Sequence, residues 1–93
     1  MKINQEWKNR ENIIKLELQD LKTQQREAMN AFAYDMKTLK AEIAKDPSEW
    51  DCDTINNMAL CAKDRNDELK MIRRNIERLE DERKTNAWKK YEA

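Results

Sequence analysis

The sequence predicts an all-α protein, an antiparallel coiled-coil helical hairpin that pairs with a second copy into a dimeric four-helix bundle. Three observations lead to this fold class. The 93 residues contain no glycine and one proline, whereas sheet proteins use glycine for positive φ in hairpin turns and bulges. Charged residues make up 41% of the chain, against about 25% in ordinary globular domains. Apolar residues recur at alternating steps of three and four in two long segments, which is the pattern of coiled coils.

The first helix is predicted over residues 3–44. Its apolar seam consists of Trp7, Ile14, Leu18, Leu21, Ala28, Phe32, Met36, Leu39 and Ile43, with Gln25 as a polar member. Two consecutive four-residue steps surround Phe32 and form a stutter, which locally relaxes the left-handed supercoil.

A turn is predicted over residues 45–54. Pro47 cannot continue the first helix, because it lacks the N–H donor and clashes with the preceding turn. It also moves Asp46 out of the α region. Two arrangements follow from this. Either Asp46 caps a second helix that begins at Pro47, or a short helical turn precedes a new start capped by Asp53 or Thr54. In both, the chain reverses without a glycine.

The second helix is predicted over residues 55–91. Its seam consists of Ile55, Met58, Ala62, Arg65, Leu69, Ile72, Ile76, Leu79, Arg83, Asn86 and Lys90. The two seams mirror each other, so a fold back at the turn pairs Leu21 with Ile76 and Leu18 with Leu79. In this register Arg83 faces Ile14. Such polar seam residues either fix register or oligomer state at a cost in stability, or lie at the seam edge with their charged heads in water; we favour the second interpretation.

Residues 1–93 are expected to form a single domain. The free energy gained by burying the seam side chains is smaller than the free-energy cost of the conformational entropy lost when such a chain becomes ordered. Further apolar side chains lie off the seam: Ile13, Leu16, Met29, Tyr34, Leu60, Met71, Trp88 and Tyr91. We therefore expect a homodimer in which a second hairpin covers part of this surface.

Charge is unevenly distributed along the chain. Residues 1–45 hold nine basic and seven acidic side chains, residues 46–69 hold two and seven, and residues 70–93 hold eight and five. The hairpin is therefore a dipolar rod with an acidic tip and a basic open end, the open end being where the segments near the two termini meet. Such a dipole can orient an encounter with a charged partner.

The residue types argue against catalysis and cofactor binding. Without histidine the chain has no Ser–His–Asp triad and no imidazole metal ligand. The acidic tip lacks the glycine and terminal glutamate of a calcium loop. Cys52 and Cys61 are too few for a zinc site. We expect no enzymatic activity, no cofactor and no metal.

The expected function is that of a non-enzymatic protein-protein interaction module: a small regulator, inhibitor, adaptor or assembly factor acting on a larger protein or complex. Small stand-alone chains of this kind are common among phage proteins. The candidate partner-binding residues are Glu49, Trp50 and Asp51 at the tip, and Trp7, Arg83, Trp88, Lys89, Lys90 and Tyr91 at the open end. Trp50 either folds back onto the helix ends or anchors a partner.

The alternative function is that of a nucleic-acid-binding helical bundle. Lysines and arginines at the open end could neutralise phosphate groups, and the aromatic rings there could stack on bases. Acidic residues are interleaved with these cations, whereas dedicated nucleic-acid binders usually show a basic excess.

The sequence also predicts a location inside the cell. No apolar run approaches the ~20 residues needed to span a bilayer, and the first ten residues lack the apolar core of a signal peptide. Two cysteines do not make a disulfide framework. We expect a cytoplasmic protein with two free thiols and no membrane contact.

Overall fold

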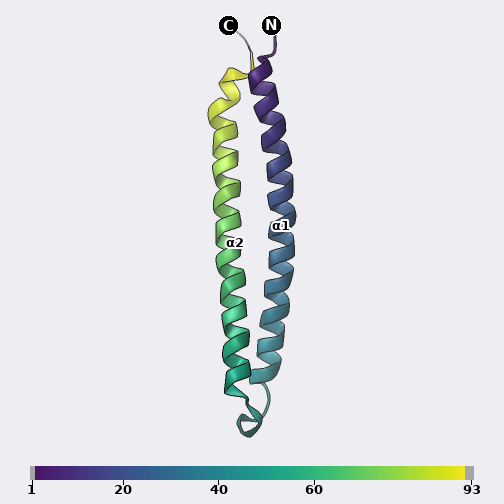
Figure 1. Cartoon of the computed structure of the whole chain (residues 1–93), viewed down its shortest axis with the longest axis vertical. Helices are drawn as coiled ribbons and strands as arrows, with labels where there is room; N and C mark the ends of the chain where they lie inside the picture. The colour runs from purple at the N-terminus through teal and green to yellow at the C-terminus, as the bar shows by residue number, and fades with distance from the viewer. Residues whose placement is uncertain (1, 92–93) are drawn as a thin grey trace.

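The computed structural model describes residues 2–91 and shows two long antiparallel helices joined by a short turn (Figure 1). The elements are α1 (Gln5–Ile43), η1 (Pro47–Glu49), α2 (Cys52–Asn86) and η2 (Ala87–Lys90), where η denotes a 3₁₀ helix. The molecule is a rod of 73 × 15 × 14 Å. The two chain ends lie together at one end of the rod, and the turn forms the other (Figure 1). The predicted all-α helical hairpin is confirmed.

Helix α1 begins at Gln5 because Asn4 supplies its N-cap. The Asn4 side-chain oxygen accepts hydrogen bonds from the backbone N–H groups of Glu6, at 3.0 Å, and Trp7, at 3.3 Å. These bonds satisfy two of the free donors that every helix start exposes. The helix ends at Ile43, shortly before Pro47.

The turn begins with a cap of its own. The Asp46 carboxylate accepts hydrogen bonds from Ser48, from its backbone N–H at 3.0 Å and its hydroxyl at 2.9 Å. Pro47 occupies the first position of η1, where its missing N–H costs nothing. Of the residues that the structure describes, none has positive φ. The reversal therefore uses Asp46 and Pro47 and needs no glycine.

Helix α2 starts at a different cap from those expected. The Asp51 carboxylate accepts hydrogen bonds from the N–H of Asp53, at 3.1 Å, and from the hydroxyl of Thr54, at 2.9 Å. Of the two arrangements the sequence left open, the short helical turn followed by a new start is the one observed. The cap is Asp51 rather than Asp53 or Thr54, so α2 begins at Cys52 and not at residue 55.

The core is a single seam between α1 and α2. Its buried side chains are Ile14, Leu18, Ala28, Ala62, Leu69, Ile72, Ile76 and Leu79. Ile14 and Leu79 are each only 1% exposed. Burial weakens toward the tip, where Ile43 is 46% exposed. The tightest packing therefore lies in the part of the rod nearer the open end.

The predicted seam position Arg65 is wrong. Arg65 lies on the surface and forms an ion pair with Glu68 at 3.2 Å. Asn66 is half-buried in its place, between the buried Ala62 and Leu69. The seam runs from Ala62 to Asn66 to Leu69, a step of four residues and then three, whereas the prediction had three and then four. Both orders keep the side chains on one face of the helix. The neutral amide of Asn66 is cheaper to desolvate than the Arg65 guanidinium.

The register also differs from the predicted one. Ile3 and Tyr91 form an isolated antiparallel bridge, and Arg83 pairs with Glu11 across the seam rather than facing Ile14. This places α2 about one seam step away from the predicted alignment. Because the seam steps are three or four residues, apolar side chains face each other in both alignments.

The end of α2 tightens where a continuous α-helix was expected up to residue 91. The α-helix stops at Asn86, and η2 continues to Lys90. The Lys90 carbonyl then accepts a hydrogen bond from the Asn4 N–H at 2.8 Å. This bond ties the two chain ends together. Within the part of the chain that the structure describes, neither long helix has the apolar stretch that a bilayer crossing requires.

We predict that Leu79→Ala destabilises the hairpin by roughly 2–5 kcal/mol, because it opens a cavity in the most buried layer of the seam. The matched control is Leu60→Ala, since Leu60 is 51% exposed and its loss should cost within about 0.5 kcal/mol. Chemical denaturation followed by circular dichroism measures both. Equal effects of the two substitutions would contradict this core.

The register is tested with paired cysteines in a Cys52→Ser, Cys61→Ser background. Leu18 and Ile76 each lie one seven-residue repeat from the Glu11–Arg83 pair and both belong to the buried seam. Leu18→Cys with Ile76→Cys should form an intrachain disulfide more readily than Leu21→Cys with Ile76→Cys. The opposite preference would restore the register expected from the sequence.

Candidate functional site

Two ion pairs across the seam close the open end. Arg10 donates to Glu82 through two bonds, Nε to Oε1 and Nη2 to Oε2, each of 2.8 Å. Arg83 Nε donates to Glu11 Oε1 at 2.8 Å, and Arg83 Nη2 lies 2.6 Å from the same oxygen as an ion pair. Each pair joins one residue of α1 to one residue of α2. We call these four residues the end clamp.

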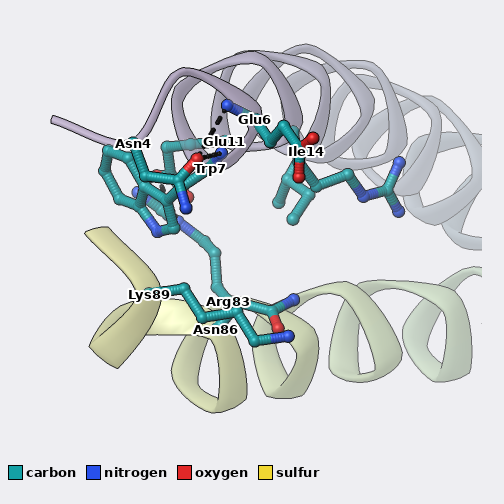
Figure 2. Close-up of a pocket in the computed structure, with 9 residues that line it drawn as sticks. Asn4, Glu6, Trp7, Glu11, Ile14, Arg83, Asn86 and Lys89 are labelled. Carbon is teal, nitrogen blue, oxygen red and sulfur yellow. Dashed lines mark hydrogen bonds and ion pairs between the residues drawn. The ribbon is translucent and has the colours of Figure 1, made fainter. Parts of the chain in front are cut away.

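A shallow pocket of about 180 Å³ lies beside the end clamp. Its lining residues are Asn4, Glu6, Trp7, Arg10, Glu11, Ile14, Arg83, Asn86 and Lys89. Figure 2 shows the Arg83 side chain extending from α2 toward Glu11 on α1. Ligand pockets usually measure about 300–1,000 Å³, so this hollow is smaller than a typical small-molecule site.

Aromatic rings and lysines cover the extremity of the rod. The Lys90 ammonium lies 5.6 Å from the centre of the Trp7 ring and 5.4 Å from that of Tyr91. Lys89 lies 5.3 Å from the centre of the Trp88 ring. Trp88 is 76% exposed and Tyr91 49% exposed. We call Trp88, Lys89, Lys90 and Tyr91 the end surface.

The structure brings the open-end candidates together but gives them different environments. Trp7 is half-buried beneath Lys90, and Arg83 is engaged by Glu11. Trp88, Lys89 and Tyr91 are exposed. The sequence interpretation did not identify the end clamp, although Arg10-Glu11 on one arm and Glu82-Arg83 on the other place opposite charges at mirrored positions.

The tip candidates have local structural partners. The Trp50 indole N–H donates to the Lys45 carbonyl at 2.9 Å, so the ring folds back against the end of α1 and remains 40% exposed. Asp51 caps α2, and Glu49 is exposed. Trp50 also lines a shallow groove formed by Ile43, Trp50, Cys52, Ile55, Asn56 and Ala59. The tip and the end surface lie at opposite ends of the rod (Figure 1).

Hydrogen bonding shifts the titration of three carboxylates. The bonds from Arg10 lower the pKa of Glu82. The Thr54 hydroxyl and backbone N–H lower the pKa of Asp51, and the Ser48 backbone N–H and hydroxyl lower the pKa of Asp46. In each case the bonds favour the ionised form.

Comparisons with protein-family models, curated proteins and solved structures found no match to this chain. Among residues 2–91, no three side chains of the His, Cys, Asp or Glu type gather in a way that could hold a metal ion.

We predict that the hairpin loses stability below about pH 4, where carboxylates protonate. A carboxylate with a lowered native pKa binds fewer protons when folded than when unfolded, so its contribution is present at neutral pH and disappears in acid. Thermal midpoints measured by circular dichroism between pH 7 and pH 2 test this.

The substitution Glu82→Gln measures how much Glu82 contributes to the stability of the hairpin and to its dependence on pH. This variant should lower the midpoint at pH 7 and reduce its dependence on pH below 4, because one protonation linkage has been removed. Glu80→Gln is the matched control, since no ion pair is recorded for Glu80 among the described residues. If Glu80→Gln and Glu82→Gln give the same curve, the Arg10–Glu82 pair does not contribute to stability.

Proposed function

We propose that this chain is a non-enzymatic protein-interaction module, a small regulator, inhibitor, adaptor or assembly factor that binds a larger protein through its end surface. The observation that carries the proposal is Trp88, whose side chain is 76% exposed. Burying a large aromatic ring against a partner is among the most favourable contacts available at an interface, and tryptophan is enriched at interaction hot spots.

The chemistry of the end surface favours an acidic partner segment. Lys89 and Lys90 lie against aromatic rings, so the surface offers positive charge and apolar area together. A partner segment with carboxylates around an apolar or aromatic side chain would match both. Electrostatic complementarity of this kind speeds association and selects among partners.

The rigidity of the open end supports the same proposal. The end clamp and the Asn4–Lys90 hydrogen bond hold the two arms together directly beside the end surface. Less conformational entropy is lost on binding when a surface is already ordered. The half-buried Trp7 ring supports Lys90 from beneath. We place this interaction in the cytoplasm, where the exposed Cys52 and Cys61 remain reduced.

Nucleic-acid binding is the competing function. Its cation supply at the open end is reduced, because Arg10 and Arg83 donate to Glu82 and Glu11. Phosphate contacts require cations that can leave their present partners. Lys89 and Lys90 remain as cations on the end surface, so a direct test is required.

We predict that Trp88→Ala lowers partner recovery about tenfold or more when the tagged protein is used for affinity capture from its native host. Tyr34→Ala is the matched control: Tyr34 is 70% exposed but lies on α1, away from both ends. Circular dichroism should show unchanged helix content in both variants. Equal recovery with the two variants would contradict the assignment to the end surface.

The same samples separate the two functions. Gel shifts with single- and double-stranded nucleic acid at ~150 mM salt measure directly whether the protein binds nucleic acid through contacts with phosphate groups. Tight binding that Lys89→Glu with Lys90→Glu abolishes would replace the protein-binding proposal by the nucleic-acid one. We expect no such shift.

A further inference from the structure

A single hairpin leaves an unusually large area in contact with solvent. Its accessible surface is 7343 Å² for 11.2 kDa, whereas a compact folded monomer of that mass exposes about 5,700 Å². The excess of about 1,600 Å² on one chain is about twice the ~800 Å² that each partner contributes to a standard protein–protein interface. Exposed apolar side chains away from the two ends contribute to it, among them Leu16, Met29 and Met71.

The two halves of the rod carry opposite net charge. The tip half, residues 26–69, holds six basic and ten acidic side chains. The open half, residues 2–25 and 70–91, holds thirteen basic and eight acidic ones. The net charge of each half is of the sign that the other half of an identical rod can neutralise.

We propose that two copies of this chain associate side by side in an antiparallel sense, with the tip half of each against the open half of the other. A parallel pair would place halves of like charge together, which is unfavourable. The antiparallel pair repeats one contact about a two-fold axis, so it closes at two chains. It covers flank surface of both rods and brings the arms of two hairpins together as four helices.

This association involves the flanks of the rod and stands apart from the proposed binding of a larger protein at the end surface. Each can fail without the other. If the protein proves to be a monomer, the affinity-capture experiment with Trp88→Ala still tests partner binding. If that capture fails, the mass measured for the free protein is unaffected.

Orientation is tested by thiol crosslinking between two marked chains. The tip-marked chain carries Cys61→Ser and keeps the exposed Cys52. The end-marked chain carries Cys52→Ser, Cys61→Ser and Ala87→Cys at an exposed position near the open end. In a mixture, we expect crosslinks mainly between the two kinds of chain. Crosslinks mainly between like chains would indicate a parallel pair and overturn the proposal.

Sedimentation equilibrium tests whether the protein is a dimer in solution. The mass should correspond to two chains and stop there as concentration rises. A monomer mass at concentrations on the order of tens of micromolar, where micromolar binding would be visible, would overturn the proposal. A mass that keeps growing would indicate end-to-end chains instead.

Charge variants test the cause. Lys70→Glu with Lys84→Glu reverses two exposed cations in the open half, and should raise the dimer dissociation constant about tenfold or more. Lys37→Glu with Lys63→Glu makes the same change in net charge in the tip half, where it should leave the dimer equal or stronger. Raising the salt concentration should weaken the wild-type dimer through screening. Equal weakening by both variants would show that the charge asymmetry has no role.

Discussion

The packing of α2 along α1 in one register is the interaction on which the rest of this molecule depends. The two helices meet along a single apolar seam, most tightly where Ile14 and Leu79 exclude solvent. Residues 2–91 form no third layer that could hold the arms in place. The end clamp and the Asn4–Lys90 hydrogen bond can form only when the arms are aligned, and they in turn select that alignment. The end surface is a result of this alignment.

The helical hairpin could be predicted from the sequence because its causes are local. The absence of glycine, the single Pro47 and two apolar repeats each point to two helices around one turn. The register could not, because a seam with steps of three and four residues presents apolar side chains at every step. The caps were ambiguous for a similar reason. Asp51, Asp53 and Thr54 offer the same hydrogen-bonding chemistry within a few residues, and which one caps α2 depends on where the turn leaves the chain.

The sequence predicted which residues meet at the open end. It did not predict the contacts or the exposure of each side chain there. Trp7, Lys90 and Tyr91 come together because segments near the two termini of a hairpin must meet. That Arg83 is held by Glu11, whereas Trp88 is left exposed, depends on the register and on the change from α2 to η2 after Asn86. Arg65 shows that spacing alone does not identify a seam residue. Its position fits the repeat, yet Arg65 is exposed and the neighbouring Asn66 is half-buried in the seam.

The position of the two chain ends has a mechanical consequence. Ile3 and Tyr91 are paired at one extremity of the rod, so a pull applied through the termini acts across the seam and not along it. The load falls first on the Asn4–Lys90 hydrogen bond, then on the end clamp, and then on one apolar layer after another toward the turn, as in opening a zipper. Each layer resists alone, so the rod would separate at low force from that end while withstanding much higher force applied lengthwise between its two extremities.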